Sequence, residues 1–118
     1  MIKSFSDLEV YQLSYELSME IFRVAKTFPN EEKYSLTSQI IRSSRSVSAN
    51  IAEGFGKRTY MGEFKKHLIY SRGSLEESKV WLSFAKDCHY LPPDEFNSLL
   101  SKADEIGAKL YKLYNGWK

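Results

Sequence analysis

The residues best suited to bind a ligand are the cations of two neighbouring segments of the sequence. A basic corner with aromatic side chains nearby is what contacts to a phosphate backbone require. The two segments are expected to form antiparallel helices joined by a turn near residue 58, which would bring their cations together. The candidate nucleic-acid-binding residues are Lys57, Arg58, Lys65, Lys66, Arg42, Arg45 and Arg72.

Structural pairing is a competing explanation for two of these cations. The preceding helix would also run antiparallel to the one that holds Arg42 and Arg45, which brings Glu20 and Glu16 level with them. Exposed ion pairs of this kind contribute little to stability, but they would occupy the two arginines. For the other cations, a solvated basic surface is an equal alternative to a binding site.

Catalytic chemistry is not favoured by the acidic and nucleophilic residues. Di-metal sites in helical bundles use two Glu-x-x-His pairs, whereas Glu63 and His67 are four residues apart and no second pair occurs. These two side chains are therefore predicted to be surface neighbours. Adjacent Cys88 and His89 would point about 100° apart on a helix, so Cys88 is predicted to be a small core residue. We predict no enzyme, catalytic residue, metal, cofactor or small-molecule substrate.

The glycine-rich segment 54–59 looks like a phosphate-binding loop at first sight. That motif needs a glycine where Ile51 stands, Ser or Thr where Arg58 stands, and a preceding strand. We predict instead a helix that stops at a left-handed glycine cap, followed by a helix capped by Thr59. The serines before this segment lack a nucleophile-elbow pattern and are predicted to permit close helix approach. They are Ser43, Ser44, Ser46 and Ser48.

Four amphipathic helices are expected to position these side chains. Apolar residues recur at spacings of three and four in four segments, and short connections favour antiparallel neighbours. Ser6 and Glu9 fit a capping box before the first helix, and Pro93 suits the first turn of the last. The sequence therefore predicts an all-α protein, a single domain over residues 1–118, folded as an antiparallel up-down-up-down four-helix bundle. The helices are expected at approximately 7–27, 35–55, 60–89 and 93–115.

The first helix carries more apolar surface than one core face requires. A second stripe lies about 100° from the core stripe and consists of Leu8, Tyr11, Tyr15 and Phe22. One explanation is a broad core face whose tyrosine hydroxyls reach solvent. The other is a subunit interface, because exposed aromatic stripes on small proteins usually have a partner. The second explanation predicts a homo-oligomer.

Composition and charge indicate where the protein is located in the cell more than what activity it has. The net charge of +2 is too small to indicate a nucleic-acid binder by itself. The single Cys88 cannot form an internal disulfide, and the first residues lack the organisation of a signal peptide. No apolar run approaches the length of a membrane span. A cytoplasmic protein without membrane contact is expected.

The most distinctive stretch of the chain is residues 39–56, which read QIIRSSRSVSANIAEGFG. It resembles the signature of a bacterial family of four-helix-bundle proteins that are encoded in 23S ribosomal RNA intervening sequences. This family is sometimes labelled a ribosomal-protein family. Three other parts of the chain agree with the resemblance: Phe5–Tyr11, Phe28-Pro29 with Glu32 and Tyr34, and Arg72–Leu75 followed by Glu77.

The resemblance implies a left-handed bundle that associates into a ring, with a homopentamer as the expected state. RNA binding is the usual conjecture for the family, and a related bundle is an accessory to a reverse transcriptase. Ser78 and Lys79 depart from the family pattern, because more apolar residues are common at these positions of the third helix. The leading hypothesis is a non-enzymatic homo-oligomer that binds structured RNA weakly. The alternative is a protein-interaction scaffold or accessory subunit without direct nucleic-acid binding.

Overall fold

The protein folds entirely into helices over the part of the chain that its structure describes, residues 1–117 of a computed structural model. No strand occurs in this range, so the predicted all-α four-helix fold is confirmed. Each long helix begins and ends within two residues of its expected bounds. The elements are η1 (Phe5–Asp7), α1 (Glu9–Ala25), η2 (Asn30–Glu32), α2 (Leu36–Gly56), α3 (Met61–Asp87) and α4 (Pro93–Gly116).

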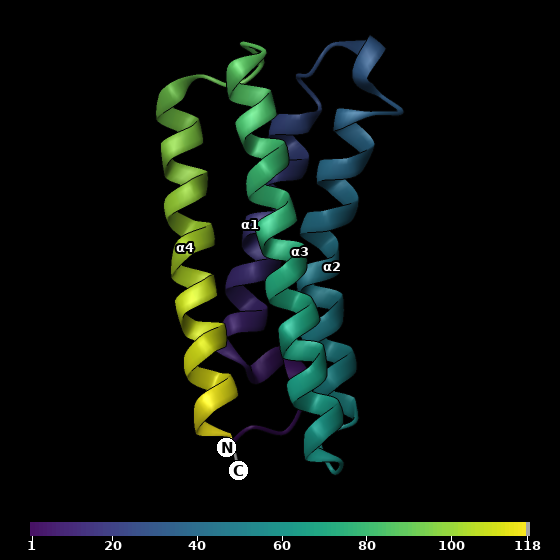
Figure 1. Ribbon diagram of the computed structural model, residues 1–118, viewed down its shortest axis with the longest axis vertical. Helices are drawn as coiled ribbons and strands as arrows, with labels where there is room; N and C mark the ends of the chain where they lie inside the picture. Colours follow the sequence, from purple (N-terminus) through teal and green to yellow (C-terminus); the bar gives the residue numbers. More distant parts are fainter. Residues whose placement is uncertain (118) are drawn as a thin grey trace.

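The four helices run alternately up and down in a bundle of 44 × 25 × 20 Å (Figure 1). Two connections, residues 26–35 and 88–92, lie together at the upper end, which we call the loop end. The α2–α3 turn lies at the opposite end, together with both chain termini. We call this opposite end the basic end, because residues 57–66 contribute four Lys or Arg side chains there.

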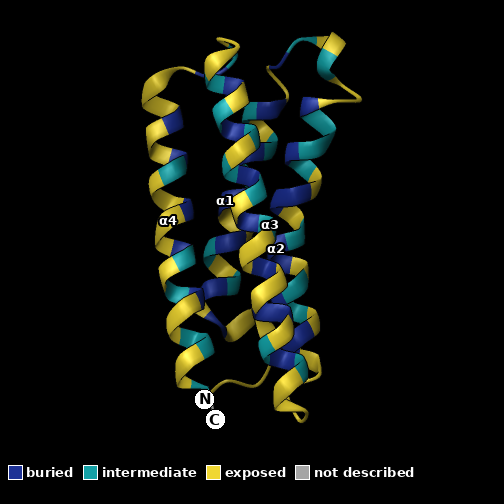
Figure 2. Cartoon of the chain, in the orientation of Figure 1, coloured by how far each residue is buried: buried dark blue, intermediate teal, exposed yellow. Residues whose placement is uncertain are grey.

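The core is built from one apolar stripe on each helix. Buried positions lie on the sides of the helices that face one another, and exposed positions lie on the outside (Figure 2). Full burial of a side chain of this size contributes about 1.5–3 kcal/mol, so these residues hold the bundle together. The most deeply buried include Ile21, Ile40, Ile51, Phe64, Leu68, Leu75, Leu82, Ile106 and Leu110.

Small residues bring α2 close to its neighbours, as predicted from its serines. Ser43 on α2 shares a 2.8 Å hydrogen bond with Ser78 on α3, and both are buried. Ser48 shares a 2.9 Å hydrogen bond with Ser14 on α1. The hydroxyl of Ser71 donates to the backbone carbonyl of Val47 at 2.8 Å. These contacts satisfy the buried hydroxyls across two helix seams, which is how a core tolerates polar groups.

The start of α1 differs from the predicted capping box at Ser6 and Glu9. The Asp7 carboxylate instead accepts the backbone N–H groups of Lys3 at 2.8 Å and Ser4 at 3.1 Å, which lowers the pKa of Asp7. A turn of 3-10 helix therefore precedes α1, and the chain enters α1 only at Glu9.

The start of α4 agrees with the prediction. Pro93 occupies the first turn, where its missing N–H has no cost, and Asp94 and Glu95 follow it. No helix within residues 1–117 combines the length and apolarity that a bilayer span needs.

Candidate nucleic-acid interface

A short turn joins α2 to α3 at the basic end. The backbone N–H of Lys57 donates to the carbonyl of Gly54 at 3.0 Å, and that of Tyr60 donates to the carbonyl of Lys57 at 2.9 Å. Helix α2 ends at Gly56 within the predicted glycine-rich stop, but the predicted left-handed cap is wrong because no glycine of the described chain has a positive φ. The predicted cap of α3 is also wrong, because Tyr60 rather than Thr59 precedes the helix. The turn leaves Lys57 and Arg58 exposed at the tip of the bundle.

A buried histidine lies directly beneath this turn. His67 is only 6% exposed, and its Nδ1 lies 3.1 Å from Oδ1 of Asn50. Its Nε2 lies 3.3 Å from Nζ of Lys57 and 3.7 Å from Oε2 of Glu53. Gly54 permits this approach of the helices, because a Cβ there would lie 2.6 Å from Cβ of His67. The histidine therefore links the core of α3 to a cation at the basic tip.

The predicted surface pairing of Glu63 with His67 is wrong. Glu63 instead pairs with Lys66 at 3.0 Å, and their hydrogen bond lowers the pKa of Glu63 and raises that of Lys66. His67 points inward because it lies three residues after Phe64 and four before Ser71, both fully buried. The periodicity of the core stripe was the signal that could have identified it.

The cations of the basic end are only partly neutralised. Lys57 pairs with Glu53 at 3.3 Å, and Lys66 pairs with Glu63. Arg58 and Lys65 form no ion pair within residues 1–117. The Arg58 guanidinium stacks 4.0 Å from the ring of Phe55, its neighbour along α2. The surface at this end can bind an anion such as a phosphate, because its positive charge exceeds its negative charge.

The structure separates the other three candidate arginines onto three helix seams. Arg42 pairs with Glu77 across the α2–α3 seam. Arg45 lies 5.2 Å from the ring of Phe22 across the α1–α2 seam, and Arg72 lies 5.6 Å from the ring of Tyr111 across the α3–α4 seam. They do not form one site with each other.

The acidic partners suggested for Arg42 and Arg45 were Glu20 and Glu16. Neither pair forms: Glu20 accepts Lys102 of α4 at 2.7 Å. Arg42 does form a structural ion pair, but its partner is Glu77 on α3. The Glu20 side chain lies towards Lys102 of α4 rather than towards α2.

The four residues proposed as an interface stripe differ in how far they are buried. Leu8 is 3% exposed and belongs to the core of its own chain, so its assignment to an interface is wrong. It precedes the first helical residue with extended backbone, and therefore does not follow the helical spacing. Tyr11 and Phe22 are half-buried, and Tyr15 is 51% exposed. The aromatic rings of Tyr11 and Tyr15 lie 6.1 Å apart.

An aromatic groove that the sequence patterns did not predict lies at the loop end. It has a volume of about 400 Å³ between the start of α2 and the end of α3. Trp81 and Phe84 line it, with ring centroids 5.8 Å apart, and its lining also includes Tyr34 and Leu36. We call it the loop-end groove. Apolar residues beside the core stripe of α3 were the signal for it.

Cys88, predicted to be a core residue, is exposed and also lines the loop-end groove. It follows the last residue of α3, so the helical spacing that would have buried it ends just before it.

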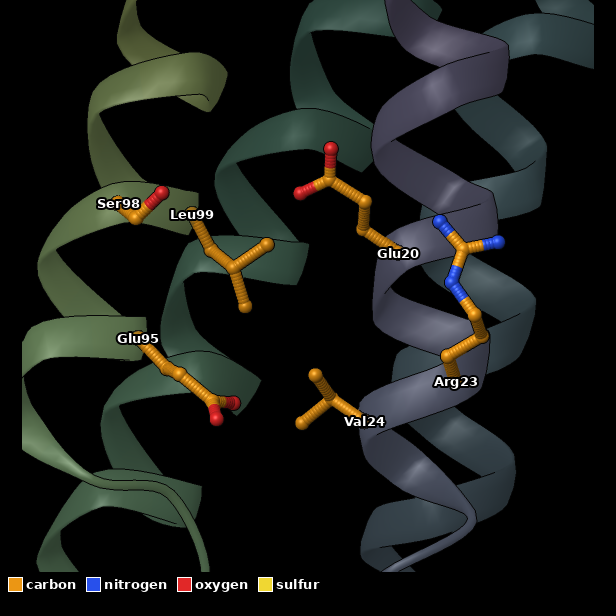
Figure 3. A pocket seen from close by; sticks show the side chains of 6 residues that line it. All are labelled: Glu20, Arg23, Val24, Glu95, Ser98 and Leu99. Carbon is orange, nitrogen blue, oxygen red and sulfur yellow. The ribbon is translucent and has the colours of Figure 1, made fainter.

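A smaller pocket of about 280 Å³ lies between α1 and α4. Figure 3 shows Glu95 and Leu99 from α4 facing Glu20 and Val24 from α1. Glu20 forms an ion pair with Lys102 of α4, with Nζ 2.7 Å from Oε1. In the described part of the chain, no group of three or more His, Cys, Asp or Glu side chains is arranged to hold a metal ion.

Two comparisons with known proteins find similar chains. The sequence profile of the 23S rRNA-intervening sequence protein family matches residues 6–112. A crystal structure from Bacteroides thetaiotaomicron, described as a protein with unknown function from the S23 ribosomal protein family, has a TM-score of 0.81 and 25% identity. That match covers 89% of this chain and 97% of the other. No curated protein matches the chain.

Proposed function

We propose that this chain, which belongs to the 23S rRNA-intervening sequence protein family, is a non-enzymatic bundle that binds structured RNA. The observation that carries the proposal is the charge of the basic end. Within residues 57–66, four cations stand against Glu63 alone, and two of those cations form no ion pair with a described residue. The proposal also requires the cytoplasmic location that the sequence predicts.

Phosphate contacts are the chemistry that this surface supports. Lysine and arginine side chains at an exposed tip can approach the RNA backbone without displacing the bundle core. Each phosphate that they neutralise releases a condensed counterion, so the affinity should fall as salt rises. A small number of such contacts predicts weak binding.

A fluorescence-anisotropy titration against ribosomal RNA fragments tests the proposal. We expect binding at micromolar protein that weakens several-fold when salt rises from about 50 to 200 mM. The test variant is Arg58→Glu/Lys66→Glu, and the matched control is Lys26→Glu/Lys33→Glu at the loop end. Both variants change the net charge equally, so only the location of the charge differs.

The basic-end variant should bind at least tenfold more weakly than the wild type, and the control should change much less. Absence of salt-sensitive binding at micromolar protein would sink the proposal. Equal losses in the two variants would show that total charge, rather than the basic end, governs binding.

The protein is also proposed to assemble with itself, as the homopentamer that the resemblance implies. A ring requires two different patches that fit each other. Exposed aromatic surface lies on two separate faces, at Tyr15 on α1 and in the loop-end groove around Phe84. Such surface on a small protein favours a partner.

Native mass spectrometry tests the assembly. We expect a multiple of the 13.7 kDa chain, a shift towards monomer for Phe84→Glu, and no shift for Asn97→Glu on the outer face of α4. A monomer at every working concentration would contradict the assembly proposal without affecting RNA binding.

The second candidate function is a protein-interaction scaffold, and the loop-end groove is the observation that favours it. A pull-down from nuclease-treated lysate distinguishes the two functions. A protein partner that survives nuclease, and is lost with Trp81→Ala, would favour the scaffold.

A further inference from the structure

A mixed basic and aromatic surface runs along the α3–α4 seam beside the basic end. Lys65, Ile69 and Arg72 are spaced four and three residues apart on α3 and so lie on one stripe. The Lys65 ammonium lies 5.0 Å from the ring centroid of Tyr114 on α4, and the Arg72 guanidinium lies 5.6 Å from that of Tyr111. We call these five residues the tyrosine face.

The tyrosine face carries positive charge without local compensation. No Asp or Glu occurs in residues 64–75 of α3 or in residues 106–116 of α4. Neither Lys65 nor Arg72 forms an ion pair with another residue of the described chain. The two positions are about 10 Å apart along the helix, a spacing at which a polyanion can engage both.

Apolar and aromatic surface is exposed between these charges. Tyr111 is 56% exposed and Ile69 is 53% exposed, whereas Tyr114 is half-buried at the helix seam. A ligand that approaches Lys65 and Arg72 therefore also meets the ring of Tyr111 and the side chain of Ile69. The ligand must offer flat apolar surface as well as negative charge.

We infer that the tyrosine face binds unpaired nucleotides, such as the loops and bulges of a folded RNA, with bases stacked on tyrosine and phosphates on the cations. The inference rests on the proposed function and narrows its ligand. An unpaired base can stack on an aromatic ring, and such stacking tolerates any base. A duplex hides its base faces, so it would engage the cations but leave Ile69 against a charged backbone.

The experiment compares two probes by fluorescence anisotropy: a single-stranded RNA of about 12 nucleotides and the duplex of the same sequence. The variants are Tyr111→Leu, which removes the ring, and Tyr111→Phe, which retains it. Tyr111→Phe serves as the matched control, because it removes only the hydroxyl. Circular dichroism verifies folding, and light scattering on the same samples reports assembly.

We expect tighter binding of the single strand, a loss of roughly fivefold or more with Tyr111→Leu, and no loss with Tyr111→Phe. Equal, salt-sensitive binding of both probes with no effect of Tyr111→Leu overturns this inference and leaves the proposed function standing. Absence of binding to the single strand overturns this inference, and the titration against ribosomal RNA fragments then decides the proposed function separately. A change of assembly with Tyr111→Leu, without a change in single-strand affinity, assigns the tyrosine face to contact with a second copy and also overturns the inference.

Discussion

The connections between helices at the two ends of the bundle are held by different side-chain contacts. At the loop end, one carboxylate ties the two connections together. Glu32 accepts hydrogen bonds from the hydroxyl of Ser35 at 2.6 Å and from that of Tyr90 at 2.9 Å. The ring of Tyr90 also lies 5.7 Å from that of Phe28. The Glu32 carboxylate is therefore satisfied within the chain.

At the basic end, the polar groups are not all used within the chain. The buried His67 engages Asn50 and Lys57, but Arg58 and Lys65 have no carboxylate partner among the described residues. Like charges that remain unpaired oppose compact folding. The loop connection at residues 26–35 balances two lysines with two glutamates, whereas the basic end keeps an excess of cations that a ligand can neutralise.

The largest effect on stability is expected from a substitution at Gly54, where α2 packs against α3 at the basic end. A Cβ there would meet Cβ of His67 at 2.6 Å, and neither atom can move without separating α2 from α3. Overpacking of this kind costs about 1–3 kcal/mol, which outweighs the gain of up to about 1 kcal/mol in helix propensity. We expect Gly54→Ala to lower the free energy of unfolding by about 1–2 kcal/mol, measured by urea denaturation.

Gly73 is the matched control within α3, because no atom lies within 4 Å of the position of its Cβ. Gly73→Ala should raise the free energy of unfolding by roughly 0.5–1 kcal/mol. If both variants were stabilising, the close helix approach at the basic end would be wrong.

A smaller effect is expected from Tyr90→Phe at the loop end. The hydrogen bond to Glu32 raises the pKa of Tyr90 from 10.0 to about 12, and the hydroxyls of Ser35 and Tyr90 lower the pKa of Glu32 from 4.5. A raised pKa stabilises the fold below the unfolded value, and a lowered one stabilises it above that value. The variant should therefore melt at a lower temperature than the wild type near neutral pH.

The pH dependence of this difference sharpens the test. The difference in melting temperature should shrink as pH rises from 10 towards 12, where Tyr90 loses its stabilising proton, and as pH falls below 4.5. Lysine titration affects both proteins and cancels. Tyr34→Phe should show no difference at any pH, because its ring is exposed at the same end. A constant difference would contradict the role of the Glu32 bond.

The last prediction concerns which ring nitrogen of His67, at the basic end, carries the proton. Nδ1 of His67 faces the side-chain amide oxygen (Oδ1) of Asn50, and Nε2 faces the ammonium of Lys57. The neutral ring should therefore carry its proton on Nδ1. Long-range nitrogen–proton NMR correlations distinguish the tautomers, with the exposed His89 as the internal reference. A proton on Nε2 would show that Lys57 does not occupy that position.

Much of the fold was predictable because helical periodicity is a local property. Residues three and four apart share a face whatever lies opposite, so the stripes containing Ile21, Leu68 and Ile106 identified the core directly. Pro93 marked the start of α4 because its backbone suits only the first turn. The clustering of Lys57, Arg58, Lys65 and Lys66 at one end likewise followed from four helices and short connections.

The four helices, their inward faces and the end at which the positive charge lies follow from local patterns in the amino-acid sequence. Only the tertiary structure decided the partners: Glu77 rather than Glu20 for Arg42, and the cations over Tyr111 and Tyr114. Only the tertiary structure placed Leu8 inside the chain. The physical reason is that periodicity fixes which face a residue occupies, whereas its partner depends on the rotation and register of a neighbouring helix, which no single segment encodes.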